Sequence, residues 1–244
     1  MLTKEYLQYE GDKFSKSRGV GVFGDQASLT GQSSSVFRYY LLSSRPESSD
    51  SQFLWRDFIA KHNTELLNNL GNLVNRVIKF LNSKYKAVLP DYTKDTKDTA
   101  GVKRLEEDIN SLLTEYIETM DALRIRQGLK IAMDLSTRVN VFLQENKLDN
   151  NLFNNFPERC AATIGGAANA IYLLSAMLSP FVPGTSNSID EQLNVPRLAV
   201  PDRWQVGDIL PGHAIGRPVY LFKKIEESEE ANWKSKFGGA PKQN

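Results

Sequence analysis

The feature that most constrains this chain is a periodic row of apolar residues between Asp57 and Lys84. Leucine and valine recur there at steps of three and four residues, the spacing that places side chains on one face of an α-helix. The row consists of Leu66, Leu70, Leu73, Val77 and Leu81, and it is widened by Leu67, Val74 and Ile78. A single long amphipathic helix is therefore predicted, and its apolar face must pack against other elements.

Similar patterns predict three further long helices, at about 102–123, 125–144 and 158–178. Pro180 and Pro183 are expected to end the last of them. With the first helix, these make a mainly α protein built as an antiparallel bundle. A last amphipathic helix is predicted from Glu226 to Phe237, ending at Gly238.

Changes in composition and periodicity along the sequence divide the chain into three segments. Residues 1–43 have the short strands, turns and short helices of a small α+β segment. Residues 44–196 hold the helical bundle. Residues 197–244 contain an extended, proline-containing stretch and the last helix, both predicted to pack on the bundle.

Composition limits what the chain can be. With 244 residues, of which 41% are hydrophobic, it can bury a sizeable core. The balance of 30 basic to 29 acidic residues excludes a broadly cationic surface, so any nucleic-acid contact must come from a local patch. The lone cysteine, Cys160, cannot form an internal disulfide or a cysteine-based zinc cluster, and we predict that it is buried and that the chain has no metal site.

The chain is predicted to be cytoplasmic and to make no contact with a membrane. The first residues, Met1 to Glu5, lack the apolar core of a secretory signal. Residues 160–178 carry no charge and approach the roughly 20 apolar residues that cross a bilayer. Their small and polar members, such as Gly165, Gly166 and Asn169, favour a helix packed inside a bundle instead.

A basic loop precedes these helices. Lys13-Phe14-Ser15-Lys16-Ser17 is followed directly by Arg18-Gly19-Val20-Gly21. Two ammonium groups three residues apart in a loop rich in serine and glycine can both face a polyphosphate. The alternative is a solvated basic loop with no ligand, because short patterns of this kind also arise by chance.

The long first helix carries more asparagine than helix stability favours, since the amide competes for backbone hydrogen bonds. The asparagines are Asn63, Asn68, Asn69, Asn72 and Asn75. Asn72 and Arg76 are four residues apart, so an amide and a guanidinium project from one face and could match base edges. For Asn63, Asn68 and Asn75, hydrogen bonding between helices or capping is the preferred interpretation.

Taken together, these segments resemble one family, the methionyl-tRNA synthetases of the cytosolic eukaryotic type. The basic loop is similar to the Lys-Met-Ser-Lys-Ser signature of class I aminoacyl-tRNA synthetases, with Phe14 in place of methionine. The further matching segments, in the same order, are Gly19 to Gly24, Arg38 to Leu42, Arg45-Pro46-Glu47, Asp50 to Phe58, and Asn63 to Arg76. The resemblance covers nearly the whole chain and is strongest over residues 6–82.

The resemblance implies a helical anticodon-binding domain preceded by part of a connecting domain. It implies a parent enzyme, a methionine–tRNA ligase, that activates methionine with ATP and Mg²⁺ and esterifies it to tRNA(Met). Lys13 and Lys16 would then be catalytic and, with Ser15 and Ser17, would bind the phosphates of ATP. Asn72 and Arg76 would contact the CAU anticodon.

Two departures from the family pattern matter. Where many members carry Pro-Trp, whose tryptophan stacks on an anticodon base, this chain has Asn146-Lys147-Leu148-Asp149, so the stacking residue is unassigned. Asn140, Phe142 and Asn146 are candidates for that role, although a packed Phe142 is the preferred interpretation. The chain also has no His-x-Gly-His signature, since its histidines are His62 and His213.

The nucleotide-binding half of the enzyme is therefore expected to lie outside this sequence. Alone, the chain is expected to bind tRNA weakly, to bind no ATP and to be inactive. Methionine and ATP become partners only with the missing catalytic domain, and an N-terminal region could recruit partners in a multi-synthetase assembly. The alternatives are a standalone tRNA-binding or scaffold module and a purely structural helical protein.

Overall fold

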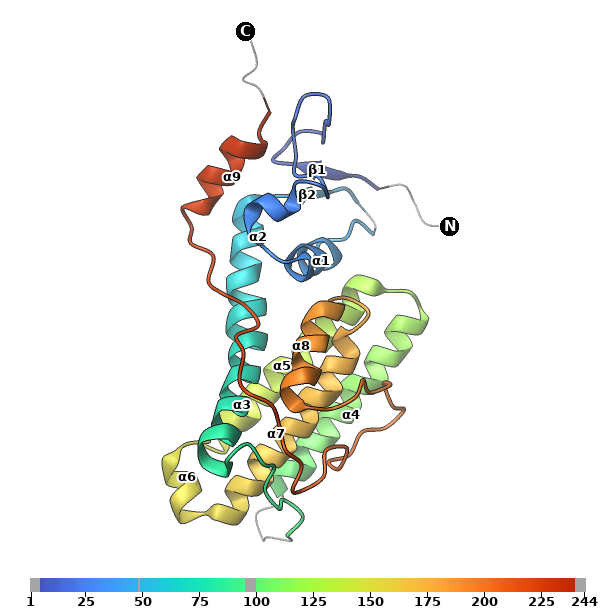
Figure 1. Ribbon diagram of the computed structural model, residues 1–244. Coiled ribbons are helices and arrows are strands. Elements are labelled where there is room, and N and C mark those ends of the chain that lie inside the picture. The colour runs from blue at the N-terminus through green and yellow to red at the C-terminus, as the bar shows by residue number, and fades with distance from the viewer. Residues whose placement is uncertain (1–4, 48, 95–99, 240–244) are drawn as a thin grey trace.

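The computed structural model describes residues 5–47, 49–94 and 100–239. Figure 1 shows a mainly α protein, with a helical bundle below and a small layer of mixed structure above, joined by one long helical column. The column consists of α2 (Trp55–Lys61), a π-helical stretch η2 (His62–Gly71) and α3 (Asn72–Tyr85), which follow one another without a break. The predicted long helix is confirmed, and its π-helical middle is a feature that the sequence pattern did not predict.

The π-helical stretch is held by side chains on both sides. The Asn72 amide N–H donates to the carbonyl of Leu67, five residues earlier, as a π-helix requires. On one side Asn69 binds α5, with its Oδ1 3.0 Å from Ser136 Oγ and its Nδ2 3.0 Å from Thr137 Oγ1. On the other side Asn63 exchanges two hydrogen bonds with the backbone of Ile225, at 2.8 and 3.0 Å. These tertiary hydrogen bonds offset the free-energy cost of the π-helical backbone, a geometry that is rare in proteins.

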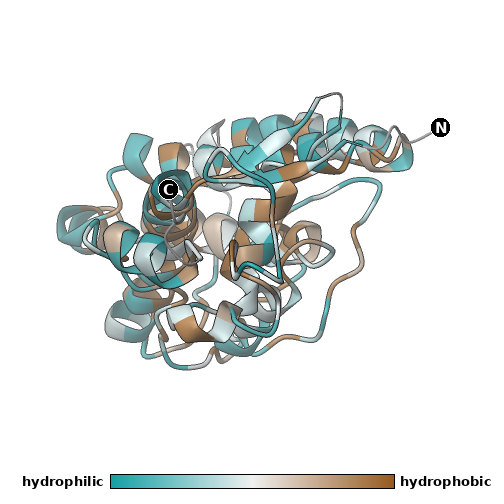
Figure 2. Ribbon diagram, turned by 90° about the horizontal axis from the view of Figure 1, so that it is seen from above, coloured by the Kyte–Doolittle hydropathy of each residue, from teal (hydrophilic) through white to brown (hydrophobic). Residues whose placement is uncertain are grey.

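The bundle contains the three further long helices and two short ones. Their bounds are α4 (Ala100–Asp121), α5 (Ile125–Glu145), α6 (Asn150–Asn155), α7 (Pro157–Leu178) and α8 (Pro183–Leu193). Figure 2 shows hydrophobic turns in the middle of the assembly and hydrophilic turns towards its edge. The long helices agree with prediction to within about two residues at each end.

Pro183 corrects one prediction. It does not simply terminate the preceding segment but occupies the first turn of α8, where the missing N–H of proline would have no partner in any case. The short helix α6 was also not predicted. The side chain of Asp149 caps it, accepting a 2.8 Å hydrogen bond from the amide of Leu152.

Helix α7 lies at the centre of the bundle. By length and composition it is apolar enough to cross a membrane, and its apolar window is entirely buried inside the described part of the protein. Cys160 is buried on this helix, as predicted, and burial raises the pKa of its thiol. The packing agrees with the interpretation of this segment as a bundle helix.

The upper layer is small and aromatic. It contains β1 (Leu7–Tyr9), the 3₁₀ turn η1 (Ala27–Thr30), α1 (Ser34–Ser43) and β2 (Ser51–Phe53). The two strands pair in parallel, with Leu7 opposite Ser51. The rings of Tyr9, Phe53, Trp55 and Phe58 fill the space between this sheet and α2. Strand β1 lies in the predicted segment 1–43 and strand β2 in the predicted segment 44–196, so the strand pair joins these two segments. The division of the chain into three segments stays a prediction.

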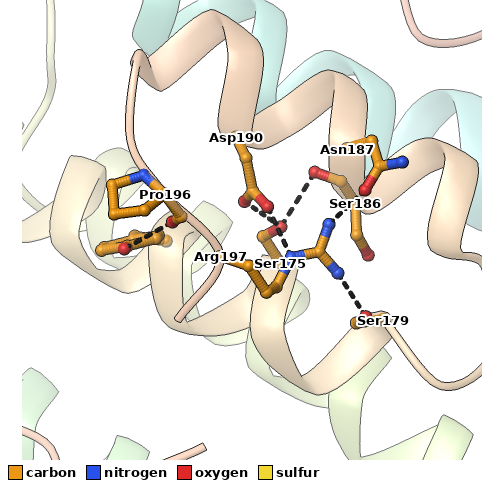
Figure 3. A network of polar contacts seen from close by, with 8 residues as sticks. Ser175, Ser179, Ser186, Asn187, Asp190, Pro196 and Arg197 are labelled. Atoms are coloured by element: carbon orange, nitrogen blue, oxygen red, sulfur yellow. Dashed lines mark hydrogen bonds and ion pairs between the residues drawn. The ribbon is translucent and has the colours of Figure 1, made fainter. Parts of the chain in front are cut away.

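A long extended strap, residues 195–228, returns from the bundle to the upper layer along the column (Figure 1). Its first part is fixed by Arg197, which binds Asp190 Oδ2 at 2.6 Å, Asn187 Oδ1 at 2.5 Å and Ser179 Oγ (Figure 3). The strap ends in α9 (Glu229–Phe237), which begins three residues later than predicted and is followed by Gly238.

Candidate phosphate loop and nucleic-acid groove

The predicted phosphate loop is a tight hairpin in the upper layer. Ser15 and Val20 exchange backbone hydrogen bonds of 2.8 and 2.9 Å, so Lys16 to Gly19 form the turn between them. The positive φ of Gly19, 66°, and of Gly21, 111°, suits glycine and explains both residues by loop geometry.

The side chains of the loop divide into two groups. Phe14 is half-buried and packs against Tyr9 and Phe23, with its ring centroid 5.3 and 5.8 Å from theirs. Lys13 and Lys16 are exposed, and the Lys16 ammonium is 3.8 Å from Asp25 in an open ion pair. The aromatic ring anchors the loop, and the two lysines flanking it are presented to solvent.

Ser15 and Ser17 complete the loop. Their hydroxyl oxygens lie 3.5 Å apart, at the limit of a hydrogen bond. Two hydroxyls and two ammonium groups on a short turn form a donor set suited to phosphate oxygens. Among the described residues no group of three His, Cys, Asp or Glu side chains could hold a metal ion.

The base of the loop is fixed by α9. The Gly21 amide donates to the carbonyl of Phe237 at 2.9 Å, and Val20 forms a β-bridge with Gly238. Lys234 Nζ lies 3.1 Å from Glu10 Oε2, while the other oxygen of Glu10 accepts from the Trp55 amide at 2.8 Å. One carboxylate therefore joins β1, α2 and α9 beneath the loop.

The second candidate site lies on α3, in the lower half of the column. Asn72 and Arg76 are both exposed. Arg76 Nη2 donates to the carbonyl of Leu148 at 3.2 Å, which turns the guanidinium towards the segment before α6. The structure thus brings the α3 face next to the segment Asn146 to Asp149, where the family tryptophan is missing.

An open groove of about 740 Å³ runs beside Arg76. Three of the residues that line the groove are cationic, namely Arg76, Lys79 and Lys84. Of these, only Arg76 was expected at this site from the sequence. The remaining lining residues are Phe80, Asn82, Ser83, Leu148, Asp149, Asn150 and Pro218. The sequence could have indicated Lys79, since it falls three residues after Arg76 on the same helix face.

The other asparagines of the column have different roles. Asn63 has a structural role, but its partner is the backbone of Ile225 in the extended strap and not another helix, whereas Asn68 is exposed and pairs with no helix among the described residues. Asn75 Oδ1 is buried with no partner in the described part of the chain. The expectation of interhelical pairing is therefore wrong for Asn63, Asn68 and Asn75.

The three residues considered as replacements for a stacking tryptophan are occupied elsewhere. Phe142 is buried, with 1% of its surface exposed, in agreement with the preferred interpretation. Asn140 Nδ2 donates to Asn69 Oδ1 at 3.0 Å, and Asn146 Nδ2 donates to the Phe142 carbonyl at 2.9 Å. None of them presents a flat, exposed ring beside Arg76.

Comparisons with known proteins show which families the two parts of the chain match. The family described as tRNA synthetases class I (M) matches residues 1–78, and the family described as the anticodon binding domain of methionyl tRNA ligase matches residues 93–242. The chain is 51% identical over 239 residues to the probable cytoplasmic methionine–tRNA ligase of Schizosaccharomyces pombe, and 51% identical over 237 residues to the cytoplasmic enzyme of Saccharomyces cerevisiae.

These matches cover 97% of this chain but only 30% and 31% of the two relatives, so the chain spans about a third of their length. A solved structure of Mycobacterium tuberculosis methionyl-tRNA synthetase bound by methionyl-adenylate is similar in fold. It aligns with a TM-score of 0.75 at 18% identity, covering 89% of this chain and 43% of that one.

Proposed function

Because this chain belongs to the methionyl-tRNA synthetase family, we propose that it is the part of such an enzyme that supplies the ATP-phosphate loop and binds the anticodon of tRNA(Met). The observation that carries the proposal is the arrangement of two exposed sites on one column. The lysine loop lies above its upper end, and the Asn72–Arg76 face lies at the start of α3, in the lower half of the column. At about 1.5 Å per residue, the stretch of column from Trp55 to this face is roughly 30 Å long.

At the anticodon site, the amide of Asn72 and the guanidinium of Arg76 would read base edges of CAU. Both groups offer paired donors or acceptors in a plane, which suits bidentate contact with bases. The carbonyl of Leu148 holds the Arg76 guanidinium at the mouth of the groove. Lys79 and Lys84 would meet the phosphates on either side.

At the loop, Lys13 and Lys16 would stabilise charge on the leaving pyrophosphate as the methionine carboxylate attacks the α-phosphorus of ATP. Ser15 and Ser17 would donate hydrogen bonds to the same phosphate oxygens. The donor set fits a polyphosphate, and Mg²⁺ would arrive with the nucleotide. The groups that bind adenine and methionine would belong to the rest of the enzyme, whose methionine–tRNA ligase activity takes place in the cytoplasm.

The test is binding of the isolated chain to an anticodon stem-loop RNA with CAU, compared with a loop in which one anticodon base is changed. Tighter binding of CAU by about five- to a hundredfold is expected for base-edge contacts worth 1–3 kcal/mol. Equal affinity for both RNAs would contradict anticodon recognition. The same chain should give no ATP–pyrophosphate exchange.

A further inference from the structure

We propose that Tyr220 is the residue on which an anticodon base stacks in the α3 groove. The inference rests on the proposed function and adds to it a contact residue from the strap. Tyr220 has 64% of its surface exposed, whereas the other rings of the strap, Trp204 and Phe222, are 1% and 6% exposed. The ring of Tyr220 is therefore open to a ligand, which the two buried rings are not.

Tyr220 is held beside the face of α3 that presents Asn72 and Arg76. Lys79 Nζ donates to its hydroxyl at 2.8 Å and lies 4.6 Å from the centre of its ring. Lys79 follows Arg76 by three residues and Asn72 by seven, so all three side chains project from the same side of the helix. The ring therefore borders the surface that presents Asn72 and Arg76.

The strap backbone around Tyr220 is fixed on both sides. The Val219 amide donates to Gln192 Oε1 at 2.9 Å, and Asn82 Nδ2 donates to the Gly216 carbonyl at 3.0 Å. Two residues after Tyr220, Phe222 is buried against Gly71, where a side chain on residue 71 would come within 3.2 Å of the phenylalanine ring. A ring carried on an ordered backbone loses little conformational freedom when a base stacks on it.

The charges around the ring favour RNA over a protein partner. The groove next to it contains Arg76, Lys79 and Lys84, and the single acidic residue in its lining is Asp149, whose carboxylate already caps α6. Stacking on an aromatic ring beside a cationic groove is how proteins hold single-stranded bases.

Other rings near the groove are less suited to stacking. Phe80 and Phe153 are half-buried and pack edge to face at 6.4 Å. The faces of these two rings are thus partly covered by the protein itself, whereas Tyr220 is 64% exposed.

The test uses the full-length enzyme that contains this segment and an anticodon stem-loop RNA with CAU. Tyr220→Ala should weaken binding by about five- to a hundredfold, the range measured for loss of one stacked base. Tyr220→Phe, which keeps the ring and loses only the hydroxyl contact with Lys79, should bind within about twofold of wild type. Val219→Ala, at the exposed neighbouring position, is the matched control and should leave affinity unchanged.

A spectroscopic arm reports on the ring directly. The tryptophans of this segment, Trp55, Trp204 and Trp233, are all buried, so Tyr220→Trp adds an exposed fluorophore. Its emission should be quenched when the RNA is added and should not change with an unrelated protein or with phosphate alone. Circular dichroism of each variant checks that the fold is intact.

The outcomes separate this proposal from the proposed function. If Arg76→Ala weakens CAU binding and Tyr220→Ala does not, the anticodon site stands and the stacking proposal is wrong. If neither variant changes binding, the anticodon assignment itself fails. Equal weakening by Tyr220→Phe and Tyr220→Ala would assign the contact to the hydroxyl and overturn stacking, and quenching by a protein partner but not by RNA would overturn it as well.

Discussion

The backbone amide of Gly21 donates a 2.9 Å hydrogen bond to the carbonyl of Phe237. This contact joins the base of the lysine loop to α9, and the Val20–Gly238 bridge repeats it one residue away on each side. The position of the loop is thus set by a helix that comes from the other end of the described chain. Whatever loosens α9 should loosen the loop.

Trp233→Ala should detach α9. The Trp233 ring is buried, with its centroid 4.8 Å from that of Trp55 and 5.9 Å from that of Phe58. Its loss should lower the free energy of unfolding by about 3–5 kcal/mol, measured by urea denaturation. Hydrogen exchange of the Gly21 amide should also become faster. Ser235→Ala, on the exposed face of α9, is the control, and an unchanged Gly21 exchange rate in Trp233→Ala would contradict the coupling.

Lys16→Ala should act on catalysis rather than on folding. In the full-length enzyme it should slow ATP–pyrophosphate exchange at saturating substrates by about 100-fold or more, because the role proposed for its ammonium is to stabilise charge that develops in the transition state. The KM for methionine should hardly change. Arg18→Ala, in the same turn, should have a much smaller effect. Normal exchange in Lys16→Ala, or a raised methionine KM alone, would argue against a role in the chemical step.

Arg76→Ala should reduce discrimination between anticodons. The guanidinium is exposed at the groove, so the apolar face of α3 is untouched and stability should be kept. Discrimination between CAU and altered anticodons should fall by about 1–3 kcal/mol, measured as a ratio of kcat/KM for aminoacylation. Arg56→Ala, an exposed arginine at the other end of the column, is the control. Equal loss for every anticodon would indicate a phosphate contact.

Arg197→Leu should destabilise the strap. Asp190, whose side chain is 9% exposed, would keep its hydrogen bond from Ser175 but lose its 2.6 Å ion pair. Because Arg197 is partly exposed and only Asp190 is buried, its loss is expected to lower the free energy of unfolding by about 1–3 kcal/mol, the cost of leaving a buried acceptor without a partner. The double variant Arg197→Leu/Asp190→Asn should recover part of this loss. If it is no more stable than the single variant, an unpaired charge is not the cause.

Stability should depend on pH through His62. Burial lowers the pKa of His62, against a smaller opposing effect of its hydrogen bond to the Lys223 carbonyl at 2.8 Å. An unfolded histidine titrates near pH 6.5. Below that pH the unfolded chain takes up a proton that the folded chain resists, so the free energy of unfolding should fall from pH 6.5 towards the folded pKa and then level off.

Urea midpoints at several pH values between 5 and 7.5 would measure this dependence. His62→Gln retains a donor for the Lys223 carbonyl and removes the titrating group, so it should flatten the curve. Wild-type and variant chains with the same slope over this range would assign the dependence to other residues.

Sequence periodicity predicted most of the bundle because a buried helical face leaves a repeating trace, as the row from Leu66 to Leu81 does. It missed η2, because a π-helix is enforced by partners such as Ser136 and Ile225 that lie far away in the sequence. It also missed α8, because Pro183 can either stop a helix or begin one.

At the candidate sites, Lys13, Lys16, Asn72 and Arg76 could be selected from local motifs. Tyr220 could not, since only the path of the strap brings it beside Lys79.

The bridge between Val20 and Gly238 joins two residues that the ribosome synthesises far apart in time. At about 5–20 residues per second, translation of the intervening chain takes roughly 10 to 40 s. During that interval the lysine loop and the aromatic layer beneath it exist without Trp233 and Phe237. The helical bundle can collapse as soon as α8 has emerged, whereas the lysine loop acquires its anchor only when the strap has been synthesised and laid along the column. A ribosome stalled after α8 would therefore carry a formed bundle and an unanchored loop.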